Sequence, residues 1–462
     1  MMKKIKIKTF QRPRGTHDIL PEAGHYWKTV REKAEELSAF YGFRRIETPH
    51  FEDSDLFCRG VGTATDIVEK QMYSFKTRGD DHLTLRPEAT APVVRAYIEN
   101  GMFNEPHPVK LWYEGSFFRH ESPQKGRFRE FHQWGLEALG EEGPVIEAEI
   151  IQVMSLFFRE IGIVDSCVEL NSIGCRECRS TIRSQIMGYY RSRSRKLCVN
   201  CRRRIKENYF RIFDCKEEKC VQLRENAPQI IEHICDPCKN HFRTLLEFME
   251  EVQVPYTLNP YLVRGLDYYT RTVFEFFVRK PVTDASDGHE EGAQGNPEDQ
   301  KNEDGHVEPN SDHSQKHSFA IAGGGRYDGL AELLGGRPTP AAGGSVGLER
   351  VIEVMRQQKI KTSHEKSAKI YLVQLGDLAK RKSLKIIEQF RQAGIPIRAT
   401  LAKDSVKSQF TLAGKVGAEF VLVFGQKEAL DEEIIIREMN SGIQETVPLA
   451  KLIESVKRNL KK

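Results

Sequence analysis

Residues 117–140, FFRHESPQKGRFREFHQWGLEALG, join two strand-like segments through a turn that is dense in charge. If the second segment is a strand, successive side chains point to opposite faces, so that Phe131, Gln133 and Glu137 share one face. Arg119 lies near the end of the first segment. An arginine, an amide and a carboxylate gathered on one face of a strand pair cost free energy unless a polar ligand meets them. The stretch therefore favours an antiparallel sheet with a ligand on one face over a solvated charged hairpin.

Two further stretches place charged side chains among apolar ones. LRPEATAPVVRAY puts Glu88 and Thr90 after a proline and before a helical pattern. Thr90 is equally well explained there as a helix cap or as a ligand contact. LVRGLDYYTRTVFEF sets Arg264 in an apolar segment ahead of Tyr268 and Tyr269. A buried arginine normally needs an anionic partner, so this segment indicates a phosphate or carboxylate ligand.

Glycine-rich stretches suggest how a nucleotide would approach the chain. AGGGRYDGL would let a ligand come close to the backbone, and GGSVGLER runs from a strand into a helix with Arg350 near its start. The sequence contains no G-x-x-x-x-G-K-[ST] loop, and no G-x-G-x-x-G follows a strand and opens a helix. Arginines over an antiparallel sheet would have to hold the phosphates instead.

Eight of the ten cysteines crowd into a basic, mostly helical block, residues 165–250, which we expect to be an inserted domain. They form three C-x-x-C pairs and one C-x₄-C pair, which suit two structural zinc sites of four thiolates each. The alternative is a set of helical cysteines that simply stay reduced. The pairs are Cys175 with Cys178, Cys198 with Cys201, Cys215 with Cys220, and Cys235 with Cys238.

The remaining patterns divide the chain into domains. Residues 1–164 and 251–358 hold the polar stretches described above, and residues 359–462 alternate strands and helices as in an α/β domain with mostly parallel strands. The segment at about 281–317 has almost no large apolar side chain, so we expect a disordered surface loop. We expect helices over 24–40, 83–99 and 144–161, and strands over 261–278 and 318–330.

Charge and hydropathy bear on three questions: whether the protein binds nucleic acid, whether it is secreted and whether it spans a membrane. The net charge of +4 permits a nucleic-acid partner without demanding one. The N-terminus lacks the apolar core of a signal peptide, and no run of about 18 apolar residues occurs, so we expect a cytoplasmic protein with no membrane span.

In this order, the stretches resemble the motifs of the class II aminoacyl-tRNA synthetases, and among them the histidyl-tRNA synthetase family. YGFRRIETPHFE is similar to motif 1, FFRHESPQKGRFREFHQ to motif 2 and GGSVGLER to motif 3; LVRGLDYYTRTVFEF and AGGGRYDGL resemble the two peptides of the histidine-specific branch. The resemblance covers nearly the whole chain. It implies an α+β fold: an antiparallel-sheet catalytic domain with the Cys-rich helical insertion, then a C-terminal α/β anticodon-binding domain. Members usually carry arginine at the position of Ser122.

The resemblance also implies an activity and a set of site residues. A homodimer would use ATP with Mg²⁺ to convert L-histidine to histidyl-adenylate, and would then move the histidyl group to the 3′ end of tRNA(His). Arg119 and Arg264 would be catalytic. The expected histidine contacts are Glu88, Thr90, Arg119, Gln133, Glu137, Arg264, Tyr268 and Tyr269. The expected ATP contacts are Arg119, Glu121, Arg127, Phe131 and Arg350.

Two other functions compete with this one. A catalytically silent paralogue, such as the regulatory subunit of ATP phosphoribosyltransferase, keeps the catalytic fold but lacks the anticodon domain and much of motif 2. A tRNA-binding sensor would tolerate the loss of Arg119 or Arg264, and this chain has both.

Overall fold

The computed structural model describes residues 10–122, 126–278, 320–362 and 368–460. The chain forms two compact units, Met1–Thr362 and Ser363–Lys462. The acidic segment expected to be a disordered loop, about 281–317, lies outside the described residues. Among the described residues, no helix has both the length and the apolar character needed to cross a membrane.

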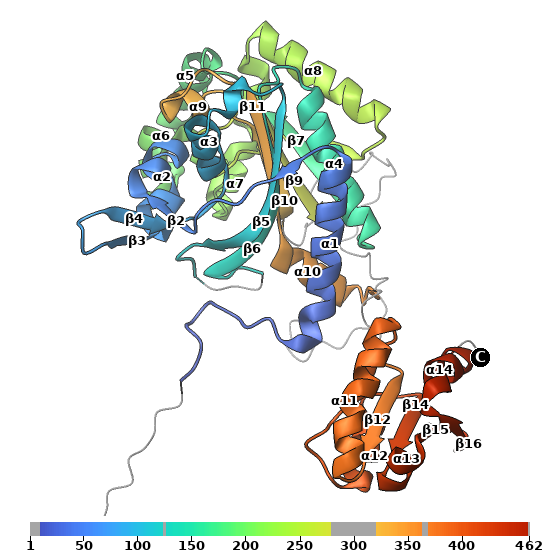
Figure 1. The fold of residues 1–462 in the computed structure, drawn as a ribbon. Helices are drawn as coiled ribbons and strands as arrows, with labels where there is room; N and C mark the ends of the chain where they lie inside the picture. Colours follow the sequence, from blue (N-terminus) through green and yellow to red (C-terminus); the bar gives the residue numbers. More distant parts are fainter. Residues whose placement is uncertain (1–9, 123–125, 279–319, 363–367, 461–462) are drawn as a thin grey trace, which may run out of the picture. The chain divides into compact units, whose positions relative to one another are not determined.

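A mixed, mainly antiparallel sheet forms the centre of the first unit (Figure 1). Its strands from β5 to β7 pair antiparallel, and β1 and β8 add to the two edges in parallel. The antiparallel pairing expected for residues 117–140 is confirmed. In spatial order the strands are β1 (Arg44–Arg45), β5 (Val109–Phe118), β6 (Glu130–Leu139), β11 (Ala341–Gly347), β10 (Ala320–Arg326), β9 (Thr270–Val278), β7 (Ser166–Ser172) and β8 (Tyr256–Leu258).

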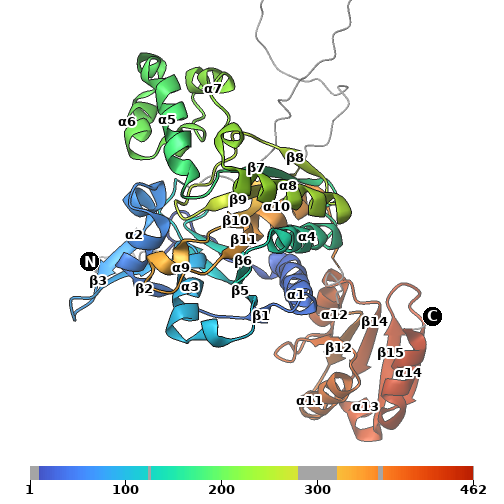
Figure 2. The same cartoon turned by 90° about the horizontal axis from the view of Figure 1, so that it is seen from above.

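Four helices pack against one face of this sheet and leave the other face to a cleft. Alternation along β6 sends Trp134 and Leu136 into the core with these helices, and the Trp134 indole donates a hydrogen bond to Ser38 Oγ at 3.0 Å. Large buried side chains such as these stabilise the fold by about 2–3 kcal/mol each. The helices, which Figure 2 shows together along one side of the sheet, are α1 (Gly24–Phe40), α4 (Val145–Glu160), α8 (Asp236–Glu251) and α10 (Leu348–Gln357).

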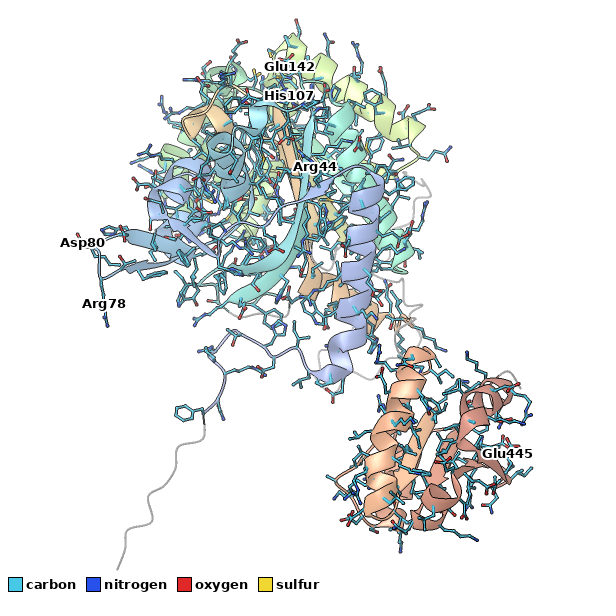
Figure 3. The ribbon with its side chains drawn as sticks, in the orientation of Figure 1. Arg44, Arg78, Asp80, His107, Glu142 and Glu445 are labelled. Carbon is cyan, nitrogen blue, oxygen red and sulfur yellow. The ribbon has the colours of Figure 1, made fainter. Side chains whose placement is uncertain are left out.

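A second sheet has three strands in the order β2-β4-β3, and just after β4 the Arg86 carbonyl accepts a hydrogen bond from the Phe118 N–H at the end of β5, at 3.0 Å. Figure 3 shows Arg78 and Asp80 at the tip of the hairpin that joins β3 and β4. The helix expected over 83–99 is only partly right, because its first residues belong to β4 and Pro87 separates that strand from the helix. The elements here are β2 (Phe51–Asp53), α2 (Ser54–Val61), η2 (Ile67–Gln71), β3 (Tyr73–Lys76), β4 (His82–Leu85) and α3 (Thr90–Glu99).

The strand expected over 261–278 begins only at Thr270, so Arg264 lies in a loop and not in a strand. Leu262, Val263 and the two tyrosines of this loop are nevertheless buried, because they pack in the core on the cleft side of the sheet. Apolar side chains in a loop that packs against a core produce the same sequence pattern as a buried strand.

The Cys-rich block contributes helices to one side of the first unit (Figure 2). Its first part is not helical, since β7 lies within 165–250 and pairs with β9 in the central sheet. We propose that the insertion begins after β7. Its elements before α8 are α5 (Cys178–Arg191), η4 (Ser194–Lys196), α6 (Val199–Glu207), η5 (Tyr209–Ile212), α7 (Glu218–Glu225) and η6 (Ile230–His233).

The second unit is a five-stranded sheet with order β13-β12-β14-β15-β16. The first three strands are parallel, as the alternating pattern predicts, and β15 and β16 add antiparallel. The strands are β12 (Ile370–Gln374), β13 (Ile397–Ala399), β14 (Phe420–Phe424), β15 (Glu433–Glu438) and β16 (Gln444–Pro448). The helices are α11 (Asp377–Gln392), α12 (Val406–Lys415), α13 (Gln426–Asp431) and α14 (Leu452–Asn459).

Candidate active site

A cleft of about 330 Å³ opens on the face of the central sheet opposite the four helices. It brings together side chains from segments far apart in the sequence. Glu137 lies just beneath the wall, where it contacts Thr90. The other residues predicted to bind histidine or ATP all line the cleft: Glu88, Thr90, Arg119, Glu121, Arg127, Phe131, Gln133, Arg264, Tyr268, Tyr269 and Arg350.

The Glu137 carboxyl group is enclosed by hydroxyl groups of neighbouring side chains behind the cleft lining, with 1% of the residue exposed. It accepts hydrogen bonds from Thr90 Oγ1 at 2.8 Å and from the hydroxyl groups of Tyr327 and, at 3.4 Å, Tyr113. Burial raises the pKa of Glu137 to about 8, although the hydrogen bonds from Tyr327 and Thr90 oppose the rise. The carboxyl group can therefore hold its proton near neutral pH and exchange it with a basic ligand.

Glu137 also determines which residue can stand opposite it on β11. A Cβ atom at Gly343 would lie 1.7 Å from a Glu137 carboxylate oxygen. Only glycine leaves room for the carboxyl group at that position.

The side chain that caps the start of α3 is that of Glu88 and not that of Thr90, for which the sequence allowed either a capping role or a ligand contact. The Glu88 carboxylate accepts the backbone N–H groups of Thr90 and Ala91 at 2.8 and 3.0 Å, and the Tyr268 hydroxyl donates to it at 3.3 Å. Burial raises the pKa of Glu88, while these hydrogen bonds and the charge of Arg119 lower it. Because Glu88 supplies the cap, the Thr90 hydroxyl is free to reach Glu137.

Arg119 lies against the ring of Phe131, with its guanidinium carbon 5.2 Å from the ring centroid. Its Nε donates to the Pro87 carbonyl at 2.8 Å, which leaves the terminal nitrogens facing the cleft. Burial lowers the pKa of Arg119, and the carboxylates of Glu121 and Glu88 raise it. An arginine remains charged under these conditions, so the cleft holds a fixed cation beside an aromatic ring.

Two more arginines enter the cleft from other elements. Arg264 donates to Glu275 at 2.7 Å, and a Cβ atom at Gly323 on β10 would meet its guanidinium at 2.6 Å. Arg350, in the first turn of α10, donates to the carbonyls of Ala320 and Gly126 at 2.5 and 3.1 Å. With Arg127, which also lines the cleft, four guanidinium groups lie on one cleft, a charge pattern that suits a polyanion.

Sequence reasoning missed three residues of the site: Tyr113, Glu275 and Tyr327. Glu275 stands between Phe274 and Phe276, both of which lie in the helix-side core, so strict alternation along β9 would have placed it on the cleft face. Tyr327 belongs to the glycine-rich stretch AGGGRYDGL, but no local signal shows that its hydroxyl reaches Glu137. Only the fold brings them together.

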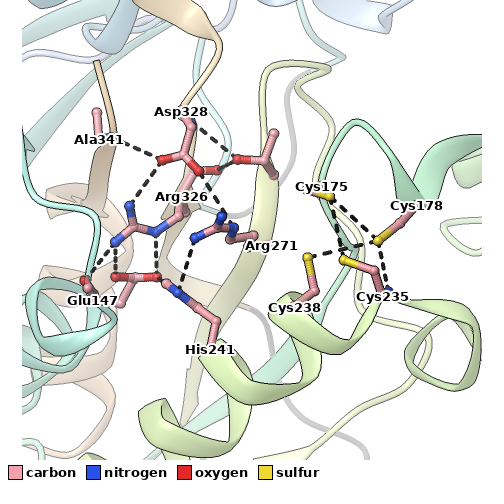
Figure 4. A network of polar contacts seen from close by, with 12 residues as sticks. Glu147, Cys175, Cys178, Cys235, Cys238, His241, Arg271, Arg326, Asp328 and Ala341 are labelled. Atoms are coloured by element: carbon pink, nitrogen blue, oxygen red, sulfur yellow. Dashed lines mark hydrogen bonds and ion pairs between the residues drawn. The ribbon is translucent and has the colours of Figure 1, made fainter. Parts of the chain in front are cut away.

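A buried ion-pair network fixes β10 next to Tyr327 (Figure 4). Arg326, fully buried, donates Nε and Nη2 to the two oxygens of Glu147 at 2.8 and 2.5 Å, and His241 Nε2 lies 2.7 Å from the same carboxylate. Burial opposes the charge of Glu147, but the contacts with Arg326 and His241 lower its pKa to about 2. Removing one partner from such a pair costs about 3–5 kcal/mol, so the network holds β10, α4 and α8 in place around the site.

The eight cysteines of the insertion meet in two clusters of four. Within each cluster the sulfur atoms all lie within 4.8 Å of one another, and the individual Sγ–Sγ distances include 3.7, 3.8 and 3.9 Å. With Zn–S bonds of about 2.3 Å, a tetrahedral site places its sulfurs about 3.8 Å apart, so the geometry fits zinc. One cluster, seen in Figure 4, joins the first and last pairs, Cys175, Cys178, Cys235 and Cys238; the other joins Cys198, Cys201, Cys215 and Cys220.

Comparison with known proteins agrees with this geometry. A family profile described as "Histidyl-tRNA synthetase" matches residues 15–178, and one described as "Anticodon binding domain" matches residues 369–459. Proteins of Dehalococcoides mccartyi and Acetivibrio thermocellus named histidine–tRNA ligase are 42% and 41% identical, over 98% and 97% of this chain and 100% and 99% of their own lengths. The crystal structure of the apo histidyl-tRNA synthetase of S. aureus, 30% identical, superposes with a TM-score of 0.75 over 97% of this chain and 99% of that one. The chain therefore belongs to the histidyl-tRNA synthetases, the histidine–tRNA ligases of class II.

Proposed function

We propose that the cleft is the site at which this histidine–tRNA ligase activates L-histidine with ATP and then passes the histidyl group to tRNA. In the first step an oxygen of the histidine carboxylate attacks the α-phosphorus, a new P–O bond forms, and the bond to pyrophosphate breaks. In the second step the terminal ribose hydroxyl of the tRNA attacks the carbonyl carbon of the adenylate, and AMP leaves.

We assign Arg119 and Arg264 to the reacting groups. A carboxylate and a phosphate repel each other, and negative charge builds up around the α-phosphorus as they react. Arg119 and Arg264 both line the cleft, and the charge of Arg264 acts on the pKa of Arg119. Two fixed cations so close together would hold both anions and stabilise the transition state without reorganising.

The pocket around Glu137 suits an imidazole ring. A carboxyl group that holds or releases a proton near neutral pH matches imidazole, whose pKa is about 6.5. Tyr268 and Tyr269, packed together with ring centroids 4.8 Å apart, would flank the ring. Glu88, Thr90 and Gln133, which line the cleft, would bind the ammonium and carboxylate groups of the amino acid. An apolar side chain in the pocket would leave Glu137 without a partner, which makes the pocket selective.

ATP would occupy the other end of the cleft. Phe131 would stack on adenine, Glu121 and Arg127 would support the nucleotide, and Arg350 would bind the outer phosphates. When bound, Mg²⁺ neutralises charge on those phosphates, and the carboxylates of Glu121 and Glu275 are oxygen donors of the kind that Mg²⁺ takes.

The observation that carries this proposal is that Arg119 and Arg264 line one cleft with Glu137 directly behind its lining, in a chain 42% identical to a histidine–tRNA ligase over 98% of its length. A catalytically silent paralogue would have no need of that arrangement. The test is exchange of labelled pyrophosphate into ATP by the purified protein, which we expect with L-histidine and not with other amino acids. Exchange that does not depend on histidine, or no exchange at all, would count against the proposal.

We also propose tRNA(His) as the nucleic-acid partner, the cytoplasm as the location, and a homodimer as the active form. The anticodon-binding domain, residues 369–459, supports the first. The family resemblance supports the others. Sedimentation of the purified protein, alone and with tRNA(His), would measure both assembly states.

We further propose that each cysteine cluster holds a structural zinc ion. The cysteines of both clusters are free of disulfide bonds, so their sulfurs remain available as ligands. Burial opposes ionisation of Cys198, but the N–H of Cys201 and the neighbouring thiols lower its pKa to about 7. Burial raises the pKa of Cys201 and of Cys220 in the same cluster, so the zinc proposal rests on the arrangement of the four sulfur atoms.

The purified protein is expected to contain about two zinc ions per chain. Replacing Cys198 and Cys201 together with serine should reduce this to about one and lower the melting temperature, because metal-binding free energy at such a site is also folding free energy. Cys58→Ser is the control, since Cys58 lies outside both clusters. Elemental analysis and thermal melts would measure both effects. A metal-free protein whose eight thiols all react in the folded state would contradict the zinc sites.

A further inference from the structure

The loop at residues 262–269, between β8 and β9, carries Arg264 into the cleft. The loop lies outside the sheet, so no ladder of strand hydrogen bonds fixes it along its length. At its far end the Asp267 N–H donates to the Val61 carbonyl at 3.0 Å. Catalytic groups must be held within about 0.5 Å of their working positions, so a loop of this kind needs support from what packs behind it.

Arg211, from η5 of the Cys-rich insertion, packs directly behind this loop. A Cβ atom at Gly265 would lie 2.7 Å from Arg211 Nη1, so the guanidinium occupies the space that a side chain there would need. The Arg211 side chain is 12% exposed and makes ion pairs with Asp66 and, at 3.4 Å, with Asp214. Two carboxylates thus balance its charge, which allows a second guanidinium to pack beside the Arg264 loop.

Two residues of the insertion next to Arg211 make further contacts, one with Asp66 and one with the Arg264 loop. Arg204 Nη2 lies 3.3 Å from the Asp66 carboxylate, and Asn208 donates to Asp267 Oδ1 at 2.5 Å. Asp66 immediately precedes η2, whose Ile67 lines the cleft. The cysteine cluster that begins at Cys198 and ends at Cys220 brackets α6 and η5. Through residues 204–211 the insertion therefore contacts Asp66, next to η2, and the Arg264 loop, and both η2 and this loop contribute residues to the cleft lining.

We propose that Arg211 is a positioning residue for histidine activation: held by Asp66, its guanidinium backs the Gly265 peptide and thereby fixes Arg264 against the reacting phosphate. The inference rests on the proposed function of the cleft. On this proposal the insertion contributes to the activation of histidine with ATP, a step that does not involve tRNA. Arg211 itself does not line the cleft.

Arg211→Ala should lower kcat for histidine-dependent pyrophosphate exchange, measured without tRNA, by about tenfold, because a misplacement of even 1 Å costs up to about a hundredfold. KM for ATP should stay within about twofold. Arg211→Lys should restore part of the rate, since an ammonium group keeps the charge that faces Asp66. Gly265→Ala should lower kcat as well, by displacing the guanidinium, and should add no further loss in the Arg211→Ala background.

Arg203→Ala is the matched control. Arg203 pairs with Glu69 at 3.3 Å and with Glu207 at 3.4 Å, so it joins α6 to η2, but among the described residues neither of these ion pairs involves the Arg264 loop. Equal losses from Arg203→Ala and Arg211→Ala would overturn the inference, because general docking of the insertion would explain them. If Arg211→Ala fails to fold, Gly265→Ala decides: a normal kcat would overturn the inference. Absence of exchange in the unchanged protein would overturn the proposed function and this inference together.

Discussion

Arg264→Ala is expected to lower histidine-dependent pyrophosphate exchange by about a thousandfold or more. Mutations that remove a single donor aimed at transition-state charge cost about 10²–10³ in kcat, and a charged guanidinium stands at the upper end. Arg264 faces the cleft, and Glu275 holds it at 2.7 Å. The loss should appear in kcat more than in KM for ATP, since the charge is needed most where phosphate charge develops.

Arg264→Ala also leaves Glu275 without its partner, which would lower the melting temperature and confuse the result. Glu275→Gln in the same background removes that unpaired carboxylate and should recover stability without recovering exchange. Arg264→Lys keeps the charge but not the planar fork, and should retain a small part of the rate. Near-normal exchange by Arg264→Ala would remove this residue from the catalytic group.

Glu137→Gln is expected to raise KM for histidine by about a hundredfold or more, while KM for ATP changes by less than about twofold. A site built around a hydrogen-bonding group discriminates by large factors when that group is changed, and Glu137 is the buried acid of the pocket. Tyr113→Phe is the control, because the Tyr113 hydroxyl lies 3.4 Å from the carboxylate and contributes a weaker contact. Equal effects on the two substrates would mean that Glu137 does not bind the imidazole.

The same variant should change how stability depends on pH. The pKa of Glu137 is about 8 in the folded protein against an ordinary value of 4.5, so the unfolded chain releases this proton first. The unfolded state then binds fewer protons, and this carboxyl group makes the free energy of unfolding fall as pH rises from about 4.5 to about 8. Glutamine does not titrate. The melting temperature of Glu137→Gln relative to the unchanged protein should therefore rise between pH 5 and pH 9. If the difference between the two melting temperatures does not change with pH, the pKa of Glu137 is not raised to about 8.

Features that depend on local periodicity could be predicted from the amino-acid sequence. Alternation along β6 assigns Phe131 and Gln133 to the cleft and Trp134 to the core, because successive strand side chains must point to opposite faces. The helical spacing of 24–40 predicts α1 with its bounds, and the strand–helix alternation after residue 368 predicts the parallel part of the second sheet. These patterns repeat over a few residues, so neighbours in the chain suffice to specify them.

Where one sequence pattern fits two local structures, long-range packing selects between them. An apolar segment around Arg264 predicts a buried strand as readily as a packed loop, and the structure makes it a loop. A threonine before a helix suits a cap or a ligand contact, and the cap is Glu88. For Thr90 the outcome depends on side chains contributed by distant elements, Glu137 and Tyr268.

The cysteines show the division most clearly. Their number and spacing indicate two four-thiolate sets, but eight cysteines in four pairs allow several groupings. The fold joins Cys175 and Cys178 to Cys235 and Cys238, because α8 returns to the start of α5 and leaves the two middle pairs to each other. The contact of Arg211 with Gly265 likewise forms because the fold brings together two segments that are distant in the sequence. Spacing along the chain sets which residues are near neighbours, whereas the contacts that build the site join residues tens to hundreds of positions apart, and only chain folding brings those together.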